Sequence, residues 1–312
     1  MENLARLPGG ASREMWAFDA RASGGAVARL VLRRDPAGHQ MQTSRRLEFA
    51  LLEAAAAAGV PVPAVRWCQD DASVLGMPFF VMDFVEGETL PRRLLRDAEY
   101  AGARRALPAQ LARALARIHR MPLSAPGLDA LPRPEPGTSP AASELTRYEQ
   151  IFRGVAPDPH PAFELAFRWL ARRPPAPPAV TVVHGDFRIG NVLFGPEGLR
   201  AVLDWELAHA GDPMEDLGWL CVRAWRFGAD DRPVGGLTSR EDLLECYARE
   251  AGAPPDPEAV RWWEVFGNLK WGIICILQAN AFLVGGVQNV ELASLGRRTA
   301  ETELELLDLM EA

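Results

Sequence analysis

The sequence predicts an α+β protein of two lobes, with a small N-terminal lobe of strands and one helix and a larger, mainly helical C-terminal lobe. Three observations predict it. In the first 85 residues, short runs of branched and aromatic residues flank one Ala-rich helical segment. From residue 86 onward, helical apolar spacing predominates. Within that part, residues 180–204 return to short strands. We therefore place the two lobes at residues 1–85 and 86–312.

Composition narrows the class of protein. Of 312 residues, 48% are hydrophobic and 24% charged, as in ordinary globular proteins. The net charge of −7 argues against a nucleic-acid partner, because a phosphate backbone needs a dense basic face. The four cysteines form no CxxC pair and the first ten residues lack the apolar core of a signal peptide, so we expect a cytoplasmic protein. The apolar run Val265–Val284 carries several polar groups and predicts a buried helix, not a membrane span.

The N-terminal elements follow from local patterns. Branched residues predict strands, and Thr43–Ala58 has helical spacing and ends at Gly59. The predicted strands are Glu14–Asp19, Ala26–Arg33, Val62–Cys68 and Phe79–Phe84.

The C-terminal elements alternate between amphipathic segments and breakers. The Pro- and Gly-rich stretch Pro122–Pro140 predicts a loop, and Asp212 followed by Pro213 predicts a capped helix start. The predicted helices are Pro108–His119, Glu144–Arg153, Pro161–Arg172 and the charged C-terminal helix Leu292–Leu309.

The sharpest motif is HGDFRIGN, residues 184–191, which follows the apolar strand residues Thr181 to Val183. Asp186 and Asn191 lie in this motif, and Asp204 follows the predicted strand Leu199 to Leu203. Phosphoryl transfer needs one carboxylate to accept the proton of the attacking hydroxyl, and an amide and a second carboxylate to hold Mg²⁺. The hard oxygen donors suit Mg²⁺, and the lack of cysteine or paired histidine nearby argues against zinc.

This motif resembles the catalytic loop of the aminoglycoside phosphotransferase and choline kinase superfamily, which reads HGDxxxxN. The resemblance implies a protein-kinase-like fold that uses ATP and Mg²⁺. It implies that Asp186 is the catalytic base and that Asn191 and Asp204 are the metal ligands. The downstream GDPMEDLG also matches; Asp216 within it, and His119 on an earlier helix, are expected to be structural.

The resemblance also implies a nucleotide site in the N-terminal lobe. Arg33 stands where the family has a phosphate-binding lysine, and Glu48 stands where its ion-pair partner lies; Arg34 and Glu53 are alternatives for these two roles. Arginine presents a planar fork, so it can bridge phosphates and a carboxylate with altered geometry. The backbone at the end of the predicted strand Phe79–Phe84 would be the hinge that binds the adenine of ATP. The Gly-rich turn near the N-terminus would approach the ATP phosphates. The implied nucleotide-binding residues are Gly9, Gly10, Ser12, Arg33, Glu48, Asp83, Phe84 and Val85.

The acceptor is less clearly indicated. Arg261 to Glu264, Lys270 and Trp271, and Arg297 to Glu301 resemble a subgroup that includes the kinase-like part of acyl-CoA dehydrogenase fusion proteins. That resemblance implies a hydroxyacyl-CoA as acceptor. Core packing is the alternative for each tryptophan.

We therefore expect an ATP- and Mg²⁺-dependent phosphotransferase that acts on a hydroxyl of a small molecule. Alternatives are a kinase of a cationic acceptor such as choline or an aminoglycoside, a nucleotide-binding module without turnover, and a peptide kinase. We expect no nucleic-acid or membrane partner. The oligomeric state and the preference for ATP over GTP stay open.

Overall fold

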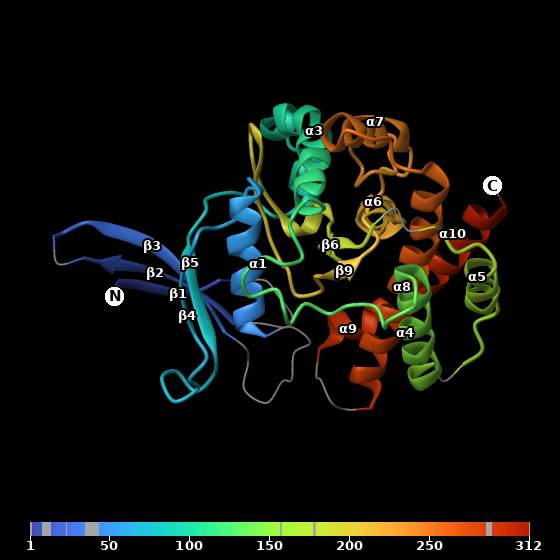
Figure 1. Cartoon of the computed structure of the whole chain (residues 1–312), viewed down its shortest axis with the longest axis horizontal. Coiled ribbons are helices and arrows are strands. Elements are labelled where there is room, and N and C mark those ends of the chain that lie inside the picture. Colours follow the sequence, from blue (N-terminus) through green and yellow to red (C-terminus); the bar gives the residue numbers. More distant parts are fainter. Residues whose placement is uncertain are drawn as a thin grey trace.

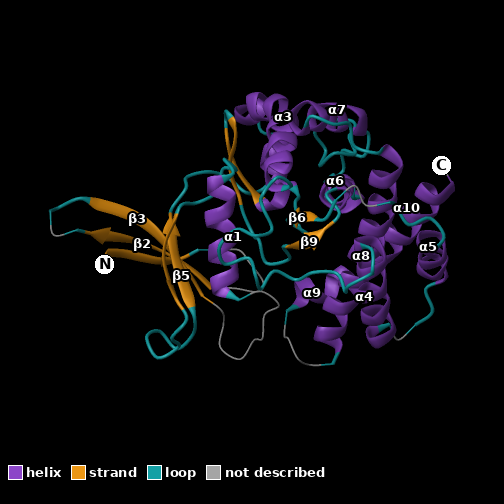
Figure 2. Cartoon of the chain, in the orientation of Figure 1, coloured by secondary structure: helices purple, strands orange, loops and turns teal. Residues whose placement is uncertain are grey.

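The computed structural model describes residues 2–7, 14–22, 24–34, 44–156, 158–176, 179–284 and 289–311. A five-stranded sheet and helix α1 form one end of the molecule, and most helices gather at the other end (Figure 1). The remaining short strands lie among those helices (Figure 2). The predicted two-lobed α+β architecture is confirmed, whereas the lobe boundary at residue 85 stays a prediction.

The strands form one sheet and two small hairpins. The sheet has the order β1-β2-β3-β5-β4, with antiparallel neighbours, and the hairpins are β6-β9 and β7-β8. The strands are β1 (Glu2–Arg6), β2 (Glu14–Arg21), β3 (Val27–Arg34), β4 (Val65–Gln69), β5 (Phe79–Asp83), β6 (Thr181–Val183), β7 (Val192–Gly195), β8 (Gly198–Val202) and β9 (His209–Gly211).

Alternating residues of β5 pack on opposite faces of the sheet. Phe80 and Met82 belong to the main core, which also includes α1, whereas Val81 packs with Leu30 in a separate cluster. A shift of one residue would exchange these faces, so burial fixes the register of β5 against β3.

Helix α1 (Arg45–Ala57) carries a polar residue into the interior beside the sheet. Ser44 caps it by accepting a hydrogen bond from the Leu47 amide, and Leu51 is fully buried on its inner face. Glu48, one turn before Leu51, is only 1% exposed. The amphipathic pattern therefore places a carboxylate against β3.

The C-terminal lobe is built around the long helix α8. Helix α6 packs closely on it: a Cβ at Gly218 would lie 2.6 Å from the Trp263 carbonyl carbon and 2.6 Å from the Glu264 amide nitrogen, so only glycine fits there. The helices after α1 are α2 (Pro91–Arg96), α3 (Ala101–Ile118), α4 (Pro140–Val155), α5 (Pro161–Ala171), α6 (Met214–Cys221), α7 (Arg240–Ala251), α8 (Pro257–Leu283), α9 (Val290–Leu295) and α10 (Thr299–Glu311).

Three predicted helix bounds are wrong. Helix α4 begins at Pro140 and not at Glu144, because Ser139 caps it and proline suits the first turn. Helix α3 begins at Ala101, and Pro108 lies inside it. A proline there removes one backbone hydrogen bond, but Ala103 and Leu107 in the preceding turns are fully buried, which offsets the loss. The predicted C-terminal helix is interrupted over Gly296–Arg298. Glycine is a poor helix former, and at Gly296 a Cβ would lie 2.9 Å from Ala279 of α8.

Other differences from the expected elements are smaller. Strand β1 was not predicted, because all five of its residues are exposed and show no apolar alternation. The predicted helix at Val265–Val284 is part of α8, but its end is not buried, since Leu283 is exposed. None of the helices in the described ranges has the length and apolarity needed to cross a bilayer.

Candidate active site

Asp186 lies in the loop between β6 and β7, and three side chains donate hydrogen bonds to its carboxylate. Trp219 Nε1 donates to Oδ1 over 2.9 Å, and Arg188 Nε donates to the same oxygen over 3.1 Å. Asn191 Nδ2 donates to Oδ2. These donors fix the orientation of a carboxylate that is 13% exposed.

The backbone before Asp186 is held by Asp216 of α6. The Asp216 carboxylate accepts hydrogen bonds from the amides of His184 and Gly185, at 2.8 and 2.9 Å, and contacts His119 Nε2 at 3.1 Å. Burial alone would raise the pKa of Asp216, but the contact with His119 lowers it overall. His119 and Asp216 therefore lie where the sequence places them, in supporting positions.

The hairpin β7-β8 brings Asn191 and Asp204 together at one end. Val192 pairs with Val202, and the Leu203 amide donates to the Asn191 carbonyl over 2.8 Å. Asp204 then turns with a φ of 65°, in the left-handed region that few non-glycine residues adopt. Both side chains line the same cavity, and their oxygen atoms are the donors that Mg²⁺ prefers.

Arg33 of β3 contacts two carboxylates from distant parts of the chain. Its Nη2 lies 3.0 Å from Oε1 of Glu48 and 2.8 Å from Oδ1 of Asp204. The Nε of Arg33 is buried and has no hydrogen-bond acceptor among the described residues. A buried donor without an acceptor fits an anionic group in the adjoining cavity. The alternative Arg34 pairs with Glu14 at 2.7 Å instead.

The cavity, about 410 Å³ in volume, extends from these charged groups to the segment after β5. Asp83, Phe84 and Val85 line that end. The amides of Asp83 and Phe84 donate to backbone carbonyls within the protein. The Val85 amide has no acceptor among the described residues, so it could donate to a ligand in the cavity. Apolar walls separate the two ends: Leu7, Val31, Met82, Leu193 and Leu203.

Gly9, Gly10 and Ser12 of the predicted Gly-rich turn lie outside the described residues.

A tryptophan cluster adjoins Asp186 on the side of α6. Trp219 packs on Trp225 with ring centroids 5.3 Å apart, and Trp225 packs on Trp271 at 4.8 Å. The guanidinium of Arg188 lies 4.7 Å from the Trp225 ring centroid, and that of Arg298 lies 5.8 Å from the Trp271 ring. Two guanidinium groups therefore lie against the rings of this cluster.

Comparison with known sequences identifies the family. The Phosphotransferase enzyme family matches residues 3–263 of the chain. The chain belongs to this family. Acyl-CoA dehydrogenase family member 11 of Gallus gallus is 33% identical over 297 residues, 88% of this chain and 37% of that protein. Acyl-CoA dehydrogenase family member 10 of Mus musculus is 31% identical over 250 residues, 74% of this chain and 22% of that protein. The phosphotransferase chain thus spans well under half the length of these relatives.

Solved structures show the same fold. A candidate aminoglycoside phosphotransferase from Ralstonia eutropha superposes with a TM-score of 0.77 at 22% identity, covering 100% of this chain and 93% of that one. A choline/ethanolamine kinase family protein from Mesorhizobium loti superposes with a TM-score of 0.63 at 19% identity, covering 99% of this chain and 91% of that one. An aminoglycoside phosphotransferase solved with AMP-PNP and hygromycin B superposes with a TM-score of 0.61 at 18% identity, covering 99% of this chain and 93% of that one. The predicted protein-kinase-like fold of this small-molecule phosphotransferase is confirmed.

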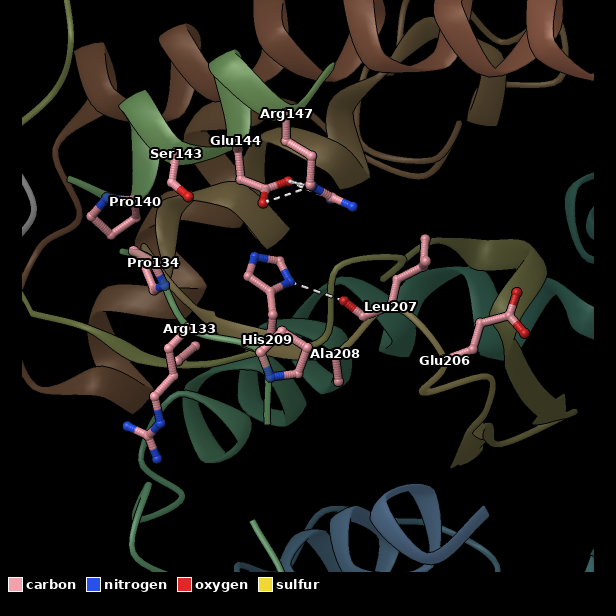
Figure 3. Close-up of a pocket in the computed structure, with 12 residues that line it drawn as sticks. Arg133, Pro134, Pro140, Ser143, Glu144, Arg147, Glu206, Leu207, Ala208 and His209 are labelled. Atoms are coloured by element: carbon pink, nitrogen blue, oxygen red, sulfur yellow. Dashed lines mark hydrogen bonds and ion pairs between the residues drawn. The ribbon is translucent and has the colours of Figure 1, made fainter. Parts of the chain in front are cut away.

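Another cavity of the phosphotransferase, about 140 Å³, lies between α4 and the loop before β9 (Figure 3). The ring of His209, the first residue of β9, points toward Glu144 of α4. Its Nδ1 lies 2.9 Å from the Leu207 carbonyl and its Nε2 lies 3.1 Å from Glu215 Oε2. Burial alone would lower the pKa of His209, but the Glu215 carboxylate raises it to about 9.

Three side chains beside this cavity are of the kinds that bind metals, but each is already paired with another charged side chain. Potential ligand atoms of Glu144, His209 and Glu215 lie within 4.8 Å of one another. However, Arg147 pairs with Glu144, and Lys270 Nζ lies 3.3 Å from Glu215 Oε1. Because each carboxylate has a cationic partner, the arrangement fits a buried ion-pair cluster better than a metal site.

Sequence reasoning did not single out Trp219. It lies three residues after Asp216 on α6, so the two side chains share a helix face. Since Asp216 was expected to contact neighbouring backbone, this spacing contained a signal that Trp219 also reaches the loop that carries Asp186. The alternative of core packing describes Trp262 and Trp263 of α8, which are 2% and 0% exposed.

Proposed function

We propose that this phosphotransferase is a Mg²⁺- and ATP-dependent kinase that phosphorylates a hydroxyl of a hydroxyacyl-CoA-type acceptor. One observation carries the kinase assignment. A single cavity has an unused hinge amide, that of Val85, at one end and Arg33, Asn191 and Asp204 at the other. Its volume and lining suit a nucleotide, with apolar walls and charged groups where phosphates would lie.

Each residue has a role that its position supports. The Val85 amide would hold the adenine edge, and Arg33 would bind phosphate oxygens through its buried Nε. Asn191 and Asp204 would hold Mg²⁺ through their oxygens. Bound Mg·ATP would supply the phosphoryl group, with the metal offsetting phosphate charge. Asp186 would accept the proton of the attacking acceptor hydroxyl, in an orientation fixed by Asn191.

The acceptor side favours an anionic or carbonyl-rich compound. Beside Asp186 lie the guanidinium of Arg188 and, further along the tryptophan cluster, that of Arg298. The indole N–H groups of Trp225 and Trp271 are buried without acceptors among the described residues. All four are hydrogen-bond donors, so they suit carbonyl, carboxylate or phosphate oxygens and disfavour a cationic acceptor. The relatives' names, acyl-CoA dehydrogenase family members 10 and 11, support an acyl-CoA compound.

The test is ATP consumption with a panel of acceptors. We expect turnover with a 3-hydroxyacyl-CoA and background rates with choline and with an aminoglycoside. In Asp186→Asn, we expect the acceptor-dependent kcat to fall by roughly 10²- to 10⁴-fold while Mg·ATP still binds. Asp70→Asn is the matched control, because Asp70 pairs with Arg46 at the exposed surface.

The other outcomes separate the alternatives. Turnover with choline or an aminoglycoside would reject the anionic acceptor. Thermal stabilisation by Mg·ATP without turnover on any acceptor would favour a nucleotide-binding module. Full turnover in Asp186→Asn would reject the catalytic base.

A further inference from the structure

The only lysine of the chain, Lys270, lies fully inside the protein next to the catalytic loop. Its Nζ donates to the Gly185 carbonyl over 3.0 Å and lies 3.3 Å from Glu215 Oε1. Burial alone would lower the pKa of Lys270, but Tyr148 and Glu215 raise it overall, so the ammonium stays charged. A buried cation thus contacts the peptide group that immediately precedes Asp186.

The backbone at this point is held from both sides. Asp216 accepts from the amides of His184 and Gly185, and Lys270 donates to the Gly185 carbonyl. Gly185 has a φ of 76°, and a Cβ there would lie 2.4 Å from the Leu207 carbonyl oxygen. The loop therefore has no room to shift toward Leu207. Its backbone N–H groups and its Gly185 carbonyl both have charged side chains as hydrogen-bond partners.

Lys270 also contacts the residue that orients the Asp186 carboxylate. Its Nζ lies 4.5 Å from the ring centroid of Trp219, whose Nε1 donates to Asp186 Oδ1. A cation near an indole ring draws electron density from it, which makes the N–H a stronger donor. Trp219 is 2% exposed and is held by packing, whereas the Arg188 side chain is 26% exposed. We therefore expect Trp219 to keep its hydrogen bond to Oδ1 if an acceptor draws Arg188 away.

We propose that Lys270 and Trp219 are positioning residues for the catalytic base: Lys270 fixes the Gly185–Asp186 peptide and polarises Trp219, and Trp219 aims the Asp186 carboxylate at the acceptor. Neither side chain touches the reacting atoms. The proposal rests on the proposed kinase function for its kinetic consequence, but its structural part holds without an acceptor.

The kinetic test is Trp219→Phe, which keeps an aromatic ring and removes the N–H. We expect kcat to fall about tenfold or more, with the KM for ATP within about twofold of wild type. The matched control is Trp262→Phe, which removes another buried indole hydrogen bond, to the Leu170 carbonyl at 3.1 Å. Equal kcat values in the two variants would overturn the role of Trp219, because a structural loss alone would affect both.

The second test is Lys270→Met, in which Glu215 keeps His209 as a partner. Amide hydrogen exchange of the segment 181–192 is measured without nucleotide, and we expect faster exchange there than in wild type and no change in the sheet of the N-terminal lobe. Unchanged exchange in this segment would overturn the role of Lys270. If Lys270→Met does not fold, Lys270→Arg is measured in its place, and we expect it to retain the protection.

These tests separate failure of this proposal from failure of the proposed function. If wild-type protein consumes no ATP with any acceptor, the kinase function fails, and hydrogen exchange alone decides whether Lys270 holds the loop. If wild type is active and Trp219→Phe is equally active, the kinase function stands and the positioning role of Trp219 is wrong.

Discussion

Nη2 of Arg33 lies 2.8 Å from Oδ1 of Asp204, so a strand of the N-terminal sheet is tied directly to the residue expected to bind the metal. The same nitrogen lies 3.0 Å from Oε1 of Glu48. Burial alone would lower the pKa of Arg33, but the two carboxylates raise it overall. One guanidinium therefore joins β3, α1 and the segment that follows the hairpin β7-β8, and it remains charged.

Replacing Arg33 by methionine should weaken nucleotide binding. The change removes a buried donor of a residue that lines the cavity, while Glu48 keeps Arg45 as a partner, so we expect the fold to be retained. We expect the KM for ATP to rise at least about tenfold, because that factor corresponds to the binding free energy of one charge-assisted hydrogen bond. Steady-state kinetics with varied ATP measures it.

Two further variants complete this series. Arg33→Lys keeps the charge but not the planar fork, so we expect only part of the loss to be recovered. Arg34→Met is the control, because Arg34 pairs with Glu14 and does not line the cavity. An unchanged KM for ATP in Arg33→Met would show that Arg33 has no part in phosphate binding.

Thermal stabilisation by ATP should require Mg²⁺. Asn191 and Asp204 offer oxygen ligands at the charged end of the cavity, and ligand at about 100 times its Kd stabilises a protein by about 2.7 kcal/mol. We expect a rise of several degrees in Tm with Mg·ATP, which EDTA removes. In Asp204→Asn the rise should be much smaller.

The control is EDTA without nucleotide, which should leave Tm unchanged. A full Tm rise with ATP in the presence of EDTA would contradict the assignment of Asn191 and Asp204 as metal ligands.

The sequence predicted the parts of this site that are local. Asp186 and Asn191 lie within eight consecutive residues, and the run that ends at Asp204 forms the other strand of the hairpin beside them. Short spacing and branched residues suffice to predict such a unit, because the hairpin register fixes which residues meet.

The remaining parts depend on contacts between distant elements. Lys270 reaches Gly185 across 85 positions of the chain, and no local pattern indicates that pairing. The break at Gly296 likewise depends on the close approach of Ala279, which helical periodicity does not reveal. Tertiary packing therefore determines what supports the catalytic loop and where the last helices begin and end.

Replacing Arg188 by methionine should weaken an anionic acceptor selectively. Arg188 stacks on Trp225 and contacts Asp186, so it lies where the acceptor oxygen would approach. We expect the KM for a hydroxyacyl-CoA to rise roughly tenfold, with a smaller change in the KM for ATP. Arg173→Met is the control, because Arg173 makes a similar contact with Trp169, 5.0 Å from its ring centroid.

A choline or aminoglycoside acceptor would give the reverse result. Removing Arg188 would then relieve repulsion and lower the acceptor KM. That outcome would reject the anionic acceptor and leave the kinase assignment intact.

The folded chain should lose stability as pH rises toward 9, because His209 releases its proton. Its pKa is raised from 6.5 to about 9, with burial opposing the shift and Glu215 outweighing it. A raised pKa stabilises the folded chain fully below pH 6.5 and loses that effect as pH passes about 9. Since Glu144 of α4 also faces this ring, the protonated form is favoured from two sides. The contribution is at most about 3 kcal/mol.

Urea unfolding at pH 6 and pH 9.5 measures this contribution in wild type and in His209→Asn. We expect the free-energy difference between the two proteins to be larger at pH 6, because only there does wild type hold the extra proton. His160→Asn is the control, since it removes a histidine–glutamate contact, with Glu303 at 2.9 Å, that is more exposed. A difference for His209→Asn that is the same at both pH values would mean that His209 is neutral in the folded chain.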